Sequence, residues 1–260
     1  MIRAFAIALL AFVSIDPCSA DPALDALVVA YPEHFAGHDN RDLIFKDGTR
    51  LKINDGVAGK NFEQMLDTPD IKDQFVIPYP LGAPTKTPAV NEDPGRIRNE
   101  ALFVKMYGDC RKGDVAKKLR PVKWLPARGG GTVMATTVNG VAEQLAKVSA
   151  DLEKLPLDMM PFLMPSSGTY NCRTIAGTKR LSVHAYGAAI DLNAKFGDYW
   201  QWTKPKDGKL TWKNRIPLAI VEVFERHDFI WGGKWYHFDS FHFEYRPEMI
   251  ALAKQGWPRK

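Results

Sequence analysis

The sequence predicts an α+β fold in which an antiparallel sheet packs against helices, preceded by an accessory N-terminal region. Three observations lead to this expectation. Short alternating stretches typical of strands recur along the chain, and apolar residues repeat at helical spacing between 141 and 155. The composition, 45% hydrophobic and 25% charged over 260 residues, is that of a globular protein with one sizeable domain and an extension.

Residues 1–20 are predicted to be a secretory signal peptide. Arg3 provides an early positive charge, an apolar run covers 4–13, and small residues precede a cleavage point near Ala20. The apolar run is too short to span a bilayer, so no transmembrane anchor is expected. Cys18 is not preceded by the residues of a lipoprotein signal. We therefore expect an exported protein, either periplasmic or secreted.

Residues 21–94 are expected to form the accessory region. Two alternating runs within 43–53 flank an Asp-Gly pair, which is a strong hairpin signal. Four prolines then predict a stiff, extended connector: Pro78, Pro80, Pro84 and Pro88.

Residues 95–260 are expected to form the second and larger domain. An Asp-Pro pair at 93–94 predicts a helix that begins there and ends by Gly108. Segments 122–125 and 132–138 predict a second hairpin. Apolar residues of the next segment fall on one face of a helix: Val141, Leu145, Val148, Leu152 and Leu155.

Two strands and two helices complete this domain. Residues 188–193 and 241–244 alternate in polarity and predict short strands. A helix is expected from Asn214 to just before Gly232, with its apolar face packed behind those strands. Its expected buried residues are Ile216, Ile220, Phe224 and His227. Residues 247–253 predict the closing helix.

Polar residues on and beside the two predicted strands carry the expected chemistry. His184 and Asp191 lie seven positions apart around a turn at Gly187, and Asp239 precedes His242 by three. An aspartate between apolar neighbours is costly to bury unpaired, and a divalent cation is one partner that removes the cost. Two histidines and one aspartate form a three-ligand zinc set with a position left for water. Asp239 is then available as a general base.

Two patterns resemble a known peptidase family: Ser-x-His-x-x-Gly-x-Ala-x-Asp at 182–191 and Asp-x-x-His at 239–242. They resemble the zinc D-Ala-D-Ala carboxypeptidases and L-alanoyl-D-glutamate endopeptidases, with the vancomycin-resistance dipeptidases and phage endolysins among their relatives. The resemblance covers about the C-terminal third of the chain. It implies a hedgehog/DD-peptidase-like fold and one Zn²⁺ ion held by His184, Asp191 and His242, with Asp239 as the general base.

The resemblance also implies how a substrate is held and which bond is cut. Arg173 occupies the position of a family arginine that steadies the substrate carbonyl oxygen, and Ser182 either contacts substrate or only stabilises the turn. The implied substrate is a peptidoglycan stem peptide, cut at D-Ala-D-Ala or at L-Ala-D-Glu. Asp239, where vancomycin-resistance members have glutamate, tilts the expectation slightly toward the endopeptidase. A non-catalytic zinc-containing wall-binding module and a peptidoglycan amidase are the alternatives.

Other residues near the predicted site have two interpretations. Three aromatic residues either line a groove for a glycopeptide or belong to the core: Trp231, Trp235 and Tyr236. Of these, Trp235 is the candidate substrate contact. Glu244 shares a strand face with His242, and it either orients that imidazole or is exposed. His237 lacks the family spacing and is expected outside the ligand set.

Removal of residues 1–20 leaves Cys110 and Cys172 as an even pair of cysteines. In an oxidising compartment such a pair predicts a disulfide, with two separate buried thiols as the alternative. The formal net charge of +5 would suit an anionic wall polymer, although a solvated basic surface explains it more simply. No basic helix or aromatic RNA-binding pattern is present, so no nucleic-acid partner is expected. The oligomeric state does not follow from these patterns.

Overall fold

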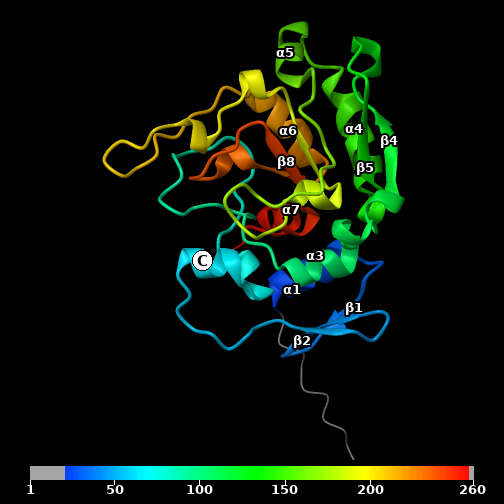
Figure 1. The fold of residues 1–260 in the computed structure, drawn as a ribbon, viewed down its shortest axis with the longest axis vertical. Helices are drawn as coiled ribbons and strands as arrows, with labels where there is room; N and C mark the ends of the chain where they lie inside the picture. Colours follow the sequence, from blue (N-terminus) through cyan, green and yellow to red (C-terminus); the bar gives the residue numbers. More distant parts are fainter. Residues whose placement is uncertain (1–20, 258–260) are drawn as a thin grey trace, which may run out of the picture.

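A computed structural model describes residues 21–257 of the chain. The predicted signal peptide and Cys18 therefore lie outside the described residues. Within 21–257 the chain forms seven α-helices and three small antiparallel sheets (Figure 1). This arrangement confirms the predicted mixed α+β class.

The N-terminal part combines one helix with a three-stranded sheet. Helix α1 (Pro22–Ala30) is capped by the Asp21 side chain, which accepts hydrogen bonds from the first backbone N–H groups. The sheet has the order β1 (Phe35–His38), β2 (Asp42–Phe45) and β3 (Arg50–Lys52). The β2–β3 hairpin confirms the expectation from the Asp-Gly pair.

Neither α1 nor β1 was expected from the sequence. Strand β1 contains Gly37, and the pairing register of β1 with β2 shifts between Phe35 and Gly37. A glycine at such an irregularity interrupts the alternation that identifies a strand, because one residue is left out of the ladder.

The segment between the first sheet and the next long helix is mostly irregular. It contains the short helix α2 (Phe62–Asp67), and residues 76–99 form neither helix nor strand, in agreement with the proline-rich connector. The helix expected to begin at 93–94 is a wrong prediction. Helix α3 (Glu100–Tyr107) begins six residues later, and the Asn99 side chain caps it by accepting from the Leu102 N–H. Asp93 is instead fully buried, and its carboxylate binds the side chains of Arg96 and His237.

The second hairpin consists of β4 (Leu119–Lys123) and β5 (Thr132–Thr136), close to the expected segments. Helix α4 (Val141–Leu152) packs against both strands through the apolar face that its spacing predicted. A short helix, α5 (Met160–Leu163), follows before the chain enters the site region.

The third sheet has the order β6–β8–β7, with β6 (Ala189–Asp191), β7 (Phe229–Trp231) and β8 (His242–Tyr245). Strands β6 and β8 confirm the two expected strands with shorter or shifted bounds. Because β8 is central and antiparallel to both neighbours, its side chains are fixed from two sides. This sheet lies at the centre of the molecule in Figure 1, with α6 and α7 beside it.

Helix α6 (Leu218–Arg226) is shorter than predicted, because Pro217 occupies the cap and His227 ends the helix. His227 is partly exposed and its Nε2 lies 2.8 Å from an Asp151 carboxylate oxygen, so it does not belong to the buried face. Strand β7 was missed: its three residues are all buried, and such a short run shows no alternation. Helix α7 (Pro247–Lys254) confirms the closing helix.

The N-terminal helix and the C-terminal sheet share one hydrophobic core. Helix α1 packs on α7, and buried residues of both belong to the same cluster as the β6–β8 sheet. A polar contact adds to this packing, since the buried Tyr31 hydroxyl donates a 2.6 Å hydrogen bond to Glu248. The ends of the described chain are therefore fixed against each other.

Cys110 and Cys172 form a disulfide with a Cα–Cα distance of 5.6 Å. It joins the short 3₁₀ turn after α3 to the residue that directly precedes Arg173. None of the helices within residues 21–257 has the length and apolar composition that crossing a membrane requires.

Replacement of both cysteines, Cys110→Ser with Cys172→Ser, is expected to lower the free energy of unfolding by about 2–5 kcal/mol, because the disulfide restricts the unfolded chain. Urea unfolding with and without reductant measures the effect. The wild-type protein should lose stability when reduced, whereas the double variant should not respond. Equal urea midpoints for the oxidised wild-type protein and the double variant would contradict this expectation.

Candidate metal centre

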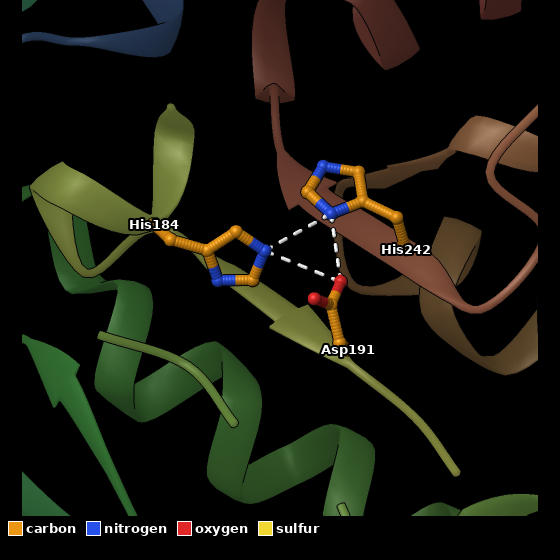
Figure 2. Close-up of side chains that lie close together, drawn as sticks. All are labelled: His184, Asp191 and His242. Atoms are coloured by element: carbon orange, nitrogen blue, oxygen red, sulfur yellow. Dashed lines mark hydrogen bonds and ion pairs between the residues drawn. The ribbon is translucent and has the colours of Figure 1, made fainter. Parts of the chain in front are cut away.

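Three side chains meet at one point between β6, β8 and the short 3₁₀ helix Val183–Tyr186. His184 Nε2 lies 3.2 Å from His242 Nδ1 and 3.2 Å from Asp191 Oδ1, and His242 Nδ1 lies 2.9 Å from the same oxygen. Figure 2 shows both imidazoles turned toward the Asp191 carboxylate. We call these three residues the His-Asp-His cluster. They are the side chains from which a metal site was expected.

The sheet register places two members of this cluster side by side. Asp191 is the last residue of β6, His242 is the first of β8, and the two are direct partners across the antiparallel ladder. Because the backbone hydrogen bonds of the ladder fix this pairing, the carboxylate and the imidazole stand on the same face of the sheet.

A tight turn positions the third member. The 3₁₀ helix that carries His184 ends at Gly187, which has φ of +67°. A Cβ at Gly187 would lie 2.7 Å from the Leu119 side chain and 3.1 Å from the Thr136 backbone nitrogen, so a larger residue does not fit. Ser182 accepts a hydrogen bond from the His184 N–H and therefore stabilises the turn.

The outer nitrogen of each histidine already has a partner. His184 Nδ1 donates to the Thr169 carbonyl oxygen, so Nε2 is the ring nitrogen that faces the cluster and can bind a metal ion. His242 Nε2 lies 3.2 Å from Glu244 Oε2 and faces away from the cluster. Glu244 is completely buried, so its role as an orienting acceptor fits and an exposed position is excluded.

The electrostatics of the cluster favour a cation. Burial opposes a charged imidazole, yet the hydrogen bonds to Asp191 and Glu244 raise the pKa of His242 to about 10. Burial also opposes a charged Asp191, but both histidines hold the pKa of that carboxyl well below its usual range. Two imidazoles and one carboxylate are a donor set typical of zinc. The cluster is the one group of this kind found in the described residues, and it fits a single ion.

Asp239 lies beside the cluster and lines the same cavity, which has a volume of about 270 Å³. Its Oδ1 is buried and has no hydrogen-bond partner among residues 21–257. Burial raises the pKa of Asp239 to about 7. A carboxyl group that titrates near neutral pH is suited to accept and release a proton.

The other predicted site residues also line this cavity. Arg173 is exposed, and its guanidinium donates a hydrogen bond to the Thr174 carbonyl oxygen. Ser182 and the nearly buried Trp235 form part of the wall, and the Trp235 indole donates to the Pro94 carbonyl oxygen at 2.8 Å. His237 lines the cavity too, but its Nδ1 binds Asp93 at 2.7 Å and not the cluster.

The remaining aromatic residues have separate places. Trp231 belongs to the core, and Tyr236 accepts a hydrogen bond from the Leu210 N–H. Sequence reasoning missed several residues of the cavity wall: Arg96, Arg98, Tyr199, Trp200 and Trp202. No local motif marks them, because they reach the cavity only through the tertiary fold.

The substitution Glu244→Gln is expected to lower zinc affinity by about 10- to 100-fold, because a ligand histidine loses its charged outer partner. Competition with a chromophoric chelator measures the affinity. Glu222→Gln on the exposed face of α6 is the matched control and should bind zinc as the wild-type protein does. Equal affinities for the two variants would show that Glu244 does not orient His242.

Zinc binding is expected to release a proton at neutral pH. Without an ion His242 is protonated, since its pKa is about 10, and a metal ion requires the unprotonated Nδ1. Affinity should therefore rise with pH, by up to about tenfold per pH unit below the pKa. Calorimetry in buffers of different ionisation enthalpy measures the released proton. An affinity that is independent of pH from neutral to alkaline solution would contradict the expectation.

A comparison with protein-family models finds a match in the C-terminal part of the chain. Residues 176–245 match the family model described as D-alanyl-D-alanine carboxypeptidase. The matched segment contains the His-Asp-His cluster and Asp239, whereas Arg173 lies just before it. No curated protein and no solved structure matches the chain. The match confirms, over residues 176–245, the resemblance that the two sequence patterns indicated.

Proposed function

We propose that this protein is a zinc-dependent peptidase that hydrolyses peptide bonds in the stem peptides of bacterial peptidoglycan. The observation that carries the proposal is the meeting of the His-Asp-His cluster with the unpartnered Asp239 carboxylate in one cavity. Both lie in the segment that matches the carboxypeptidase family. With this function we propose a hedgehog/DD-peptidase-like arrangement for the β6–β8–β7 sheet and its helices.

His184, Asp191 and His242 would hold the ion. When bound, zinc supplies a positive charge that lowers the pKa of a water molecule and polarises a peptide carbonyl group. Three protein donors leave room for that water, as catalytic zinc sites require. The protein contributes the fixed orientation of the donors through Thr169, Glu244 and the sheet register.

Asp239 would act as the general base. Its Oδ1 needs a hydrogen-bond donor, and an attacking water in the cavity can provide one. The carboxylate takes the proton as the water attacks the carbonyl carbon, and it then delivers the proton to the amine that leaves. The raised pKa suits both transfers, because the group gains and loses a proton near neutral pH.

Arg173 would stabilise the substrate. Arg173 lines the cavity and forms no ion pair with a carboxylate within residues 21–257, so it can donate to a carbonyl oxygen that gains negative charge. Ser182 and Trp235 would contact the peptide from the cavity wall. The disulfide at Cys172 restrains the chain directly before Arg173.

Two bonds are candidates for cleavage: D-Ala-D-Ala at the end of the stem peptide and L-Ala-D-Glu near its start. The description of the matching family favours cleavage of D-Ala-D-Ala. The aspartate at 239 slightly favours cleavage of L-Ala-D-Glu. The substrate also bears on where the enzyme works. We propose export to the periplasm or the cell exterior, where a disulfide forms and persists and where peptidoglycan lies.

The substitution Asp239→Ala is expected to retain zinc and to lower turnover by at least about 10²-fold, because the general base is lost. His242→Ala should lose both zinc and turnover. Metal analysis and mass spectrometry of digested muropeptides measure the two properties. Asp158→Ala on an exposed turn is the control and should behave as the wild-type protein.

The products distinguish the candidate functions. Released D-Ala identifies the carboxypeptidase, and a cut between L-Ala and D-Glu identifies the endopeptidase. Freed glycan would identify the amidase instead. Zinc binding without any product would identify a wall-binding module. Wild-type turnover in the Asp239→Ala variant would contradict the role of Asp239 as general base.

A further inference from the structure

Three arginine side chains line the cavity beside the metal centre, and their surroundings differ. Arg98 lies 3.2 Å from the buried Glu244 carboxylate. Arg173 is exposed and lies on a loop. Arg96 is mostly buried, with 12% of its side chain exposed, and is held from several directions. Arg96 is the cavity arginine that is fixed in place and lies beside the unpartnered indole Nε1 of Trp200.

A buried carboxylate and two indole rings fix the Arg96 guanidinium. Its Nη1 donates to Asp93 at 2.8 Å, and Asp93 is fully buried and also accepts from the backbone and ring of His237. The guanidinium carbon lies 5.8 Å from the ring centroid of Trp200 and 6.0 Å from that of Trp235. A guanidinium held in this way loses little freedom on binding a ligand.

The side chain has donors left for a ligand. The hydrogen bond from Arg96 to Asp93 uses one of its five N–H groups, and two carboxylates can bind different edges of one guanidinium. Beside it, the indole Nε1 of Trp200 is buried and has no hydrogen-bond partner among residues 21–257. A buried donor without a partner is rare, and an acceptor group of a ligand satisfies it. Both donors thus point to an anionic acceptor such as a carboxylate.

Arg96 is also close to the reacting groups. It lines the same cavity as the His-Asp-His cluster, and its charge and that of Arg173 oppose the rise in the pKa of Asp239 that burial causes. A ligand group bound at Arg96 therefore lies near the point where Asp239 gives its proton to the leaving amine.

We propose that Arg96 is a specificity-determining residue that binds a free carboxylate on the substrate residue released as the amine. The inference rests on the proposed peptidase function and deepens it. Both candidate bonds meet the requirement. A terminal D-Ala carries its own carboxylate, and a D-Glu joined onward through its side-chain carboxyl group keeps a free α-carboxylate. The cavity therefore selects peptides that are anionic at this position, and amidation there weakens binding.

The test compares two stem peptides that differ in one group, the free carboxylate or its primary amide. The wild-type enzyme should prefer the carboxylate peptide by roughly 10- to 100-fold in kcat/KM, the range for one charge-assisted contact. Arg96→Gln should remove this preference, mainly through a higher KM for the carboxylate peptide. Arg96→Lys should retain part of it. Arg128→Gln on the exposed surface is the matched control and should keep the full preference.

Binding is measured separately, because Arg96→Gln leaves Asp93 with one partner fewer and can alter folding. Calorimetry with the zinc-loaded Asp239→Ala variant gives dissociation constants for both peptides without turnover. The same two dissociation constants are then measured for the double variant that carries Asp239→Ala and Arg96→Gln. Since both peptides are tested on one preparation, a misfolded fraction cancels in their ratio. A carboxylate preference that survives in the Arg96→Gln background overturns the inference. Carboxylate-selective binding without any cleavage by the wild-type enzyme instead overturns the proposed hydrolysis and leaves the Arg96 site standing.

Discussion

The pairing of Asp191 with His242 across the β6–β8 ladder is the constraint on which the candidate site depends. It brings together a carboxylate and an imidazole that lie 51 positions apart in the chain, on one face of a buried sheet. A slip of β6 by one residue against β8 would turn Asp191 to the face opposite His242, because alternate residues of a strand point in opposite directions. The backbone hydrogen bonds of the small sheet thus decide whether a metal ion can be bound.

A chain of buried charges supports this pairing from behind. Glu244 contacts His242 on one side and the guanidinium groups of Arg98 and Arg246 on the other, and Arg246 in turn binds Glu248. Burial alone would neutralise Glu244, but Arg98, His242 and Arg246 hold the pKa of this carboxyl at about 2. Buried charges of this kind are retained only when each has a partner, and loss of one partner typically costs about 3–5 kcal/mol. The N-terminal helix takes part through its C-cap residue Tyr31, which binds Glu248.

The cavity is built from distant parts of the chain. The family match supplies the cluster and Asp239, but Arg96 and Arg98 come from the irregular segment before α3. That segment is fixed by Asp93, which binds His237, and by the Trp235 indole, which donates to the Pro94 carbonyl oxygen. Residues outside the matched segment therefore shape the wall that faces a substrate. Differences in substrate between proteins with the same metal ligands can arise in such walls, because the ligands themselves are common to all of them.

The sequence by itself determined the mixed fold class, the hairpins, helix α4 and the residues of the His-Asp-His cluster. These features rest on local signals: alternation, three-to-four spacing and an Asp-Gly turn. For the cluster the signal was Asp191, an aspartate between apolar neighbours that needs a partner such as a cation. Only the tertiary structure decided that Asp93 is a buried hydrogen-bond acceptor and not a helix cap. The chain turns at Gly95, and α3 begins only after its cap residue Asn99. It also decided that Glu244 is buried behind His242 and that Arg96 reaches the cavity. The contacts that bury Asp93 and Glu244 join residues 144 and 146 positions apart, and no local pattern encodes them, since they follow from how the whole core packs.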